Sequence, residues 1–112
     1  MREVRRDDGE LCGFVMQRGG RWRALTVFSG QLADFDDENA AAGHVLRHGL
    51  ASLAERWELR GRCEDEWRIV CILEANPYRV RLALDYYSLP GVPTADITVD
   101  ELRSGEWELR RR

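Results

Sequence analysis

Short segments of alternating apolar and polar residues occur at several places in this chain, whereas only one long stretch has apolar residues at helical spacing. Alternation with a period of two is typical of strands, and apolar residues at i, i+3 and i+4 are typical of an amphipathic helix. The expected order is three strands, a long helix, two strands, a short helix and a last strand. The sequence therefore predicts an α+β fold in which a curved antiparallel sheet packs on one main helix.

The length of the chain, 112 residues, is the usual size of one domain, so residues 1–112 are expected to form a single α+β domain. The first residues are basic, but no apolar segment of a signal peptide follows them, and no apolar run is long enough to span a membrane. The 3 cysteines show no Cys-x-x-Cys spacing. We therefore expect a soluble, cytoplasmic protein with reduced thiols.

All 17 basic residues are arginine, so the chain contains no lysine. This excludes Schiff-base chemistry, attachment of pyridoxal phosphate and a P-loop lysine. The chain also has no nucleophile elbow, P-loop or dinucleotide-binding fingerprint. The sequence therefore favours a protein that is not an enzyme, and it predicts no cofactor.

Residues 10–17 and 21–28 are predicted to form a hairpin around Gly19-Gly20, a pair that suits a two-residue turn with positive φ. A third strand is expected over residues 31–35. The turn predicts four cross-strand pairs, which are Arg18 with Arg21, Met16 with Arg23, Phe14 with Leu25, and Cys12 with Val27.

The two faces of this hairpin are both partly apolar. One face, expected to cover the helix, carries Cys12, Phe14, Met16, Leu25 and Val27. The other carries Leu11, Val15, Trp22, Ala24 and Phe28. A large uncovered apolar area usually marks an interface, and a two-fold pairing covers such an area with its own copy. The pattern therefore predicts a homodimer centred on Val15, Trp22 and Ala24.

The main helix is predicted over residues 38–57, with Asp36 or Asp37 as its N-cap and Gly61 after its end. Its apolar stripe is expected to contain Ala42, Leu46, Gly49, Leu50, Leu53 and Trp57.

A second hairpin is predicted around Asn76-Pro77, with Trp67, Ile69 and Cys71 on the same face as Val80, Leu82 and Leu84. On the opposite face this register pairs Arg68 with Asp85 and Glu74 with Arg79.

A capping box formed by Thr98 and Glu101 predicts a short helix over residues 99–104, and Trp107 and Leu109 alternate as a last strand. The tetrapeptide Trp-Glu-Leu-Arg occurs twice, at residues 57–60 and 107–110. Four letters also recur by chance in a chain rich in arginine and glutamate, so the sequence leaves open whether this is an internal repeat.

Two histidines, His44 and His48, are separated by one helical turn and are the weak candidates for metal ligands. A zinc site needs at least three protein ligands, and the catalytic glutamate of a zincin helix is absent. The acidic residues 34–38 lack the glycine and glutamate of a calcium loop and suit the start of a helix. We therefore predict no metal site.

The aromatic residues Trp22, Phe28, Tyr86 and Tyr87 exceed what one small core must hold, and exposed Tyr, Trp and Arg are typical of contact surfaces. A core that wraps around both faces of the sheet is the alternative explanation of the same residues. If they form a contact surface, the sequence predicts a non-catalytic protein-binding domain (adaptor, chaperone-like or immunity-like) that associates with itself. Its interface candidates are Val15, Trp22, Ala24, Phe28, Tyr86 and Tyr87.

Two alternatives remain open at this point. The first is a small-molecule binding protein or small enzyme with a pocket between sheet and helix, in which Arg79 and Arg81 join Tyr86 and Tyr87 as ligand contacts. The second is binding of nucleic acid through arginines 18, 21 and 23 at the tip of the first hairpin, which the net charge of −3 disfavours.

Overall fold

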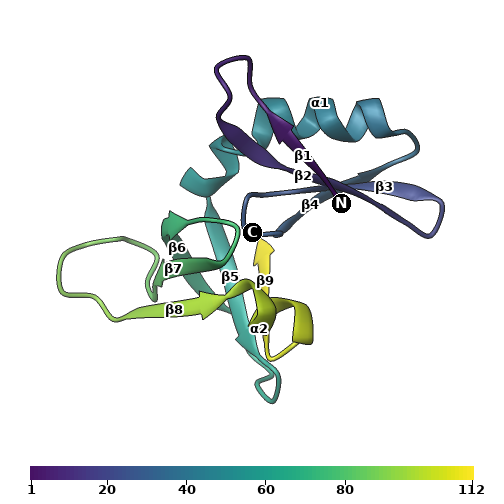
Figure 1. Ribbon diagram of the computed structural model, residues 1–112. Helices are drawn as coiled ribbons and strands as arrows, with labels where there is room; N and C mark the ends of the chain where they lie inside the picture. The colour runs from purple at the N-terminus through teal and green to yellow at the C-terminus, as the bar shows by residue number, and fades with distance from the viewer. The chain divides into compact units, whose positions relative to one another are not determined.

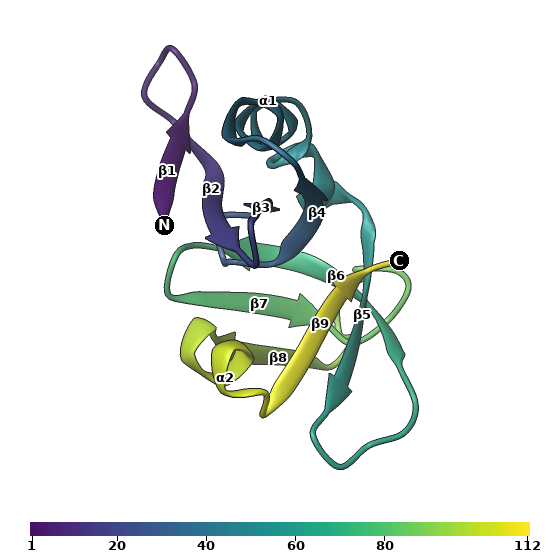
Figure 2. The same cartoon turned by 90° about the vertical axis from the view of Figure 1, so that its right-hand side faces the viewer.

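The computed structural model describes residues 1–112, which divide into two compact units, Met1–Ser52 and Leu53–Arg112. Each unit contains an antiparallel sheet of its own (Figures 1 and 2). The predicted α+β class, with antiparallel strands and one main helix, is confirmed, although the strands are divided between two sheets. The single domain over residues 1–112 stays a prediction, because two compact units can still fold as one cooperative domain.

The sheet of the first unit has the order β1-β2-β3-β4. Its strands are β1 (Arg2–Arg5), β2 (Leu11–Arg18), β3 (Arg21–Leu25) and β4 (Gln31–Phe35). The predicted hairpin register is confirmed from the pair Phe14–Leu25 to the pair Arg18–Arg21. The predicted pair of Cys12 with Val27 does not form, because β3 ends at Leu25. Strand β1 was not expected from the sequence.

Helix α1 (Glu38–His48) lies along one face of this sheet (Figure 1). The predicted N-cap is confirmed, since the carboxylate of Asp37 accepts a hydrogen bond of 2.8 Å from the amide of Ala40. The predicted extension to Trp57 is wrong. The chain passes against β2 at Gly49, where a Cβ would lie 2.4 Å from the carbonyl oxygen of Cys12, and it continues as the short 3₁₀ helix η1 (Ala51–Ala54).

The core between this sheet and α1 uses a different strand face from the one predicted. Val15 and Ala24 pack with Ala41 and Val45, whereas Phe14 and Met16 lie outside that cluster. A bulge in β2 brings Cys12, from the predicted face, into the same cluster as Val15, because Val4 lies opposite Gly13 and Arg5 lies opposite Leu11, which leaves Cys12 unpaired. One extra residue reverses the alternation of side chains along a strand.

The predicted helix stripe is confirmed only in part, because Ala42 and Leu50 pack against this core and Gly49 is buried. Ala41 and Val45 are buried, whereas Leu46, predicted on the stripe, is 47% exposed. Trp57, the last residue of the predicted stripe, lies in a strand of the second unit and not in the helix.

The sheet of the second unit has the order β8-β7-β6-β5-β9. Its elements are β5 (Arg56–Gly61), β6 (Arg68–Ala75), β7 (Arg79–Ala83), β8 (Thr94–Thr98), α2 (Val99–Ser104) and β9 (Trp107–Arg111). The capping box of α2 is confirmed, because the hydroxyl of Thr98 accepts from the amide of Glu101 at 3.1 Å and the carboxylate of Glu101 accepts from the amide of Thr98 at 3.2 Å.

The predicted register of the second hairpin is wrong. Cys71 lies opposite Ala83, and Glu74 lies opposite Arg81 rather than Arg79. Arg68 pairs with Leu59 of β5 and not with Asp85. A bulge between Ile72 and Glu74 adds a residue to β6, so Cys71 does not share a face with Leu82.

Candidate protein-interaction site

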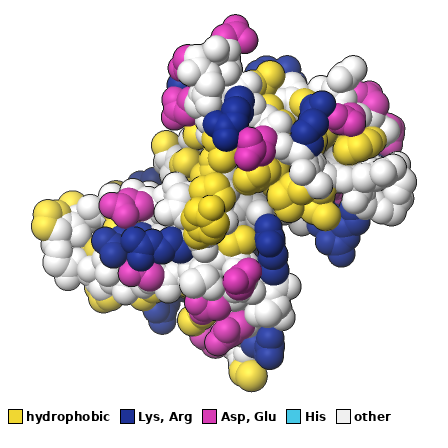
Figure 3. Space-filling model, viewed as in Figure 1, with side chains coloured by type: hydrophobic (Ala, Val, Ile, Leu, Met, Phe, Trp, Pro, Cys, Tyr) yellow, Lys and Arg dark blue, Asp and Glu magenta, His cyan; other side chains and the backbone are white.

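Residues 84–93, which join β7 to β8, form a loop that we call the aromatic loop. Tyr86 and Tyr87 are 41% and 59% exposed, and Leu89 is 61% exposed. Hydrophobic side chains lie at the tip of this loop, at the left of the space-filling view (Figures 1 and 3). Large apolar side chains that gather on an exposed loop are typical of a contact surface.

The base of the aromatic loop is held by hydrogen bonds to the sheet. The amide of Leu84 donates to the carbonyl of Pro93 at 2.8 Å and closes the loop. The thiol of Cys71 on β6 lies 3.0 Å from the carbonyl oxygen of Tyr86, to which it donates. The carboxylate of Asp85 accepts from the amide of Tyr86 at 2.7 Å. The backbone of Tyr86 is therefore held by two hydrogen bonds, one at its carbonyl oxygen and one at its amide.

The two tyrosine rings are also positioned by their neighbours. The guanidinium of Arg56 lies over the ring of Tyr86, 4.6 Å from its centre, which is the geometry of a cation–π contact. The rings of Tyr86 and Tyr87 meet edge to face with their centres 4.9 Å apart. This arrangement presents a preorganised pair of aromatic rings to solvent.

The interface candidates of the first unit occupy different surroundings. Val15, Ala24 and Phe28 are fully buried, and Trp22 packs half-buried against the core beneath α1. The apolar face on which the homodimer was predicted is therefore covered by the unit's own helix. Both faces of the hairpin are partly apolar in the sequence, so the pattern alone did not show which of them the helix covers.

The two arginines predicted as ligand contacts lie at the start of β7, whereas the tyrosines follow its end. Arg81 forms a two-bonded ion pair with Asp96 of β8, with N–O distances of 2.9 and 3.3 Å, and this hydrogen bonding lowers the pKa of that carboxyl group. Arg79 is exposed and lies opposite Thr98. The structure does not bring these arginines together with Tyr86 and Tyr87.

The histidine pair on α1 is confirmed as a pair of neighbours. The ring centres of His44 and His48 are 4.6 Å apart, and the ring of Phe35 lies 5.2 Å from that of His44. No group of three or more metal-ligating side chains includes them.

Two of the three arginines at the tip of the first hairpin, Arg21 and Arg23, are paired with acids in or just after β4. Arg23 binds both carboxylate oxygens of Asp34, at 2.8 and 3.2 Å, and Arg21 lies 3.4 Å from Asp36. The hydrogen bond from Arg23 lowers the pKa of Asp34. These acids offset the positive charge that a nucleic-acid contact would use.

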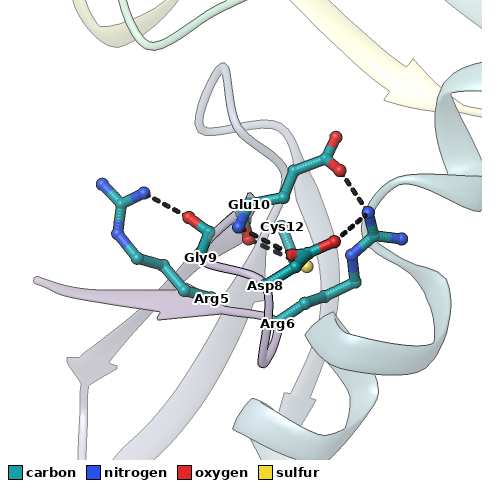
Figure 4. Close-up of polar contacts among 6 residues, drawn as sticks. All are labelled: Arg5, Arg6, Asp8, Gly9, Glu10 and Cys12. Carbon is teal, nitrogen blue, oxygen red and sulfur yellow. Dashed lines mark hydrogen bonds and ion pairs between the residues drawn. The ribbon is translucent and has the colours of Figure 1, made fainter.

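The turn between β1 and β2 carries a polar network that sequence reasoning missed (Figure 4). Arg6 contacts Asp8 and Glu10, and Arg5 donates to the carbonyl of Gly9 at 2.8 Å. The amide of Glu10 donates to Asp8 at 2.9 Å and is the main cause of the lowered pKa of that carboxyl group. A shallow depression of about 520 Å³ next to it is lined by exposed residues, namely Arg5, Arg6, Asp7, Asp8 and Leu46. Arg6 and Asp8 are already paired with each other within the turn, and Arg5 is paired with Glu3 of β1.

The repeated Trp-Glu-Leu-Arg segments lie side by side, because β5 and β9 are antiparallel neighbours (Figure 2). The register places Leu59 opposite Leu109. Glu58 therefore meets Arg110 at 3.1 Å, and Arg60 meets Glu108 at 3.0 Å. The signal for this ladder was present in the sequence, because an antiparallel pair of Glu-Leu-Arg segments opposes each glutamate to an arginine.

An aromatic side chain stacks on the same charged ladder. The ring centre of Trp67 lies 4.4 Å from the guanidinium carbon of Arg60 and 3.8 Å from that of Arg110. The second hairpin prediction placed Trp67 among core residues, whereas the structure places it between two cations.

A cavity of about 60 Å³ in the second unit is lined by Leu59, Glu64, Arg68, Leu84, Ala95 and Trp107. Sites for small molecules usually enclose roughly 300–1,000 Å³, so this cavity is too small for one.

None of the helices has the length and the apolar character that a membrane-spanning helix requires. Comparisons of the chain with protein-family models, with curated proteins and with solved structures found no match.

Proposed function

We propose that this protein is a non-catalytic interaction domain of the cytoplasm that binds a protein partner through the aromatic loop. The observation that carries the proposal is the exposed pair Tyr86 and Tyr87, held in place by Arg56. Tyrosine and arginine are enriched among the residues that contribute most to protein–protein affinity. Adaptor, chaperone-like and immunity-like roles all require such a surface.

The positioning of the rings supports this use of the loop. A side chain that is already ordered loses less conformational freedom on binding than a mobile one does. The cation–π contact and the edge-to-face contact order the rings before a partner arrives. Leu89 extends the same loop with apolar area that a partner can cover.

A ligand pocket between sheet and helix has less support. In the first unit that space is filled by apolar side chains, among them Val15, Ala24 and Val45. The cavity of the second unit is smaller than a ligand site, and Arg81 is held by Asp96. These observations favour a partner surface over a small-molecule site.

The test compares two tyrosine variants in affinity capture from native extract, followed by binding measurements with the purified partner. Tyr87→Ala removes the more exposed ring of the aromatic loop. Tyr78→Ala is the matched control, because Tyr78 is 80% exposed but lies in the turn between β6 and β7. Loss of one hot-spot ring weakens binding by on the order of 10- to 100-fold.

We expect Tyr87→Ala to lose the partner that wild type and Tyr78→Ala both retain. Circular dichroism should show the same fold for all three proteins. Equal affinity of the three for the same partner would contradict the role of the aromatic loop.

A further inference from the structure

Strand β9 is an edge of the second sheet, with β5 as its only neighbour. The amide of Arg112 donates to Arg56 at 3.1 Å, and Glu106 accepts from the amide of Arg62 at 3.0 Å. Backbone polar groups alternate in direction along an antiparallel strand. The even-numbered residues therefore bond to β5, and Trp107, Leu109 and Arg111 direct their N–H and C=O groups outward. Such an edge is a template for another strand.

The neighbour that β9 already has shows which strand it fits. Residues 57–60 and 107–110 have the same sequence, so β9 is paired with a copy of its own tetrapeptide. That pairing sets leucine opposite leucine and forms a Glu–Arg ion pair on either side. A strand with this sequence is complementary to itself when the two run antiparallel.

We propose that β9 pairs antiparallel with β9 of a second copy of this chain, with Leu109 opposite Leu109 of the partner subunit. The outward backbone groups of Leu109 then bond to their counterparts across a two-fold axis. In this register Glu108 lies opposite the partner's Arg110. The same register sets Glu106 opposite the partner's Arg112 and Trp107 opposite the partner's Arg111.

Neighbouring registers are disfavoured by charge. Only residues with outward backbone groups can form the new hydrogen-bonded pairs, and in β9 these are the odd-numbered residues. A change of register must therefore move each odd-numbered residue from one odd-numbered residue of the partner to the next. One step brings Glu108 opposite the partner's Glu108, and the opposite step brings Arg110 opposite the partner's Arg110. Like charges directly opposite each other destabilise a strand pair. The central register is therefore selected.

The dimer contact is separate from the surface of the proposed function. The aromatic loop connects β7 and β8, and β8 is the other edge of the same sheet. Loss of one contact therefore leaves the other in place. The contact involves one five-residue strand from each copy, so the interface is small and the dimer forms at high protein concentration. Its ion pairs are exposed, so added salt weakens it.

The test uses two charge-swapped variants that keep the pairing of β9 with β5. In Arg60→Glu/Glu108→Arg, the intrachain pair is reversed but kept, and arginine stands at both positions 108 and 110. In Glu58→Arg/Arg110→Glu, the other intrachain pair is reversed but kept, and glutamate stands at both positions. Each variant alone therefore sets like charges against its own copy, whereas a mixture of the two sets unlike charges against each other.

Sedimentation velocity over a concentration series should show a dimer for wild type. Each variant alone should associate more weakly by on the order of 10- to 100-fold, and the equimolar mixture should recover the dimer. Retention of the dimer by either variant alone, or a mixture that stays monomeric, would overturn the proposal. A wild type that stays monomeric throughout would overturn it as well.

A second measurement needs no variant. Because the amide of Leu109 points outward, its hydrogen exchange should slow as the wild-type concentration rises, whereas exchange at Val80 in β7 should not change. Exchange at Leu109 that is independent of concentration would also refute the strand pairing. Neither outcome depends on Tyr87, so a failure here is distinguishable from a failure of the proposed function.

Discussion

The two sheets are stabilised in different ways. In the first unit, α1 of 11 residues covers β2 and β3, and the chain comes so close to β2 at Gly49 that no side chain fits. In the second unit, α2 has only 6 residues, and the β5–β9 ladder carries cross-strand ion pairs with Trp67 stacked on them. We expect the close approach at Gly49 to tolerate no added atom, whereas the ladder of ion pairs should tolerate a reversal of both charges.

The largest effect is expected from Gly49→Ala, which tests the close packing of the first unit. A Cβ at this position would lie 2.4 Å from the carbonyl oxygen of Cys12, a backbone atom that cannot move alone. We expect a loss of about 3 kcal/mol in the free energy of unfolding, measured by urea denaturation.

The control for this variant is Gly43→Ala, which lies within helix α1. A Cβ there would meet the flexible end of the Arg47 side chain at 3.2 Å. Alanine favours a helix over glycine, so this variant should gain about 0.5–1 kcal/mol. If Gly49→Ala and Gly43→Ala changed the free energy of unfolding equally, the close approach at Gly49 would not limit the stability of the protein.

An intermediate effect is expected from Trp67→Ala, which removes the ring between Arg60 and Arg110. Two cation–π contacts and the buried part of the ring account for about 2 kcal/mol of unfolding free energy. Trp67→Phe should lose less stability, because a smaller ring remains.

Amide exchange measured in β2 and β9 of Trp67→Ala also tests the predicted single domain. Equal loss of protection in both strands supports one cooperative domain, and loss in β9 alone contradicts it.

The smallest expected effect is on the stability of the protein at acid pH. The pKa of Asp34 lies below its ordinary value of 3.8 because Arg23 donates hydrogen bonds to its carboxylate. The unfolded chain therefore takes up the proton first as the pH falls. The stabilising contribution is present above the ordinary pKa and is lost as the pH falls through the lower pKa of the folded state.

Asp34→Asn should therefore lower stability at neutral pH and reduce its decline between about pH 5 and pH 2, as followed by urea midpoints. Asp96→Asn gives the comparison in the second unit, where the pair with Arg81 is more exposed and should contribute less. A steeper acid decline in Asp34→Asn than in wild type would contradict the assigned direction of the pKa.

Local patterns in the sequence predicted local structure well. Gly19-Gly20 set the register of the first hairpin, Asp37 marked the start of α1, and Thr98 with Glu101 marked α2. Each of these signals acts through hydrogen bonds or backbone angles within a few residues. Of the four aromatic residues that the sequence singled out, Tyr86 and Tyr87 are exposed, whereas Phe28 is buried and Trp22 is half-buried.

Features that depend on distant partners were decided only by the tertiary structure. The bulge in β6 changed which residues share a face, because one unpaired residue moves every later side chain to the other side, and the bulge in β2 placed Cys12 in the core beside Val15. Helix α1 ended at His48 because the chain passes β2 at Gly49, and Trp57 joined a strand. The repeated tetrapeptide was visible in the sequence, but its meaning required the antiparallel register of β5 and β9, since only spatial neighbours can pair their charges.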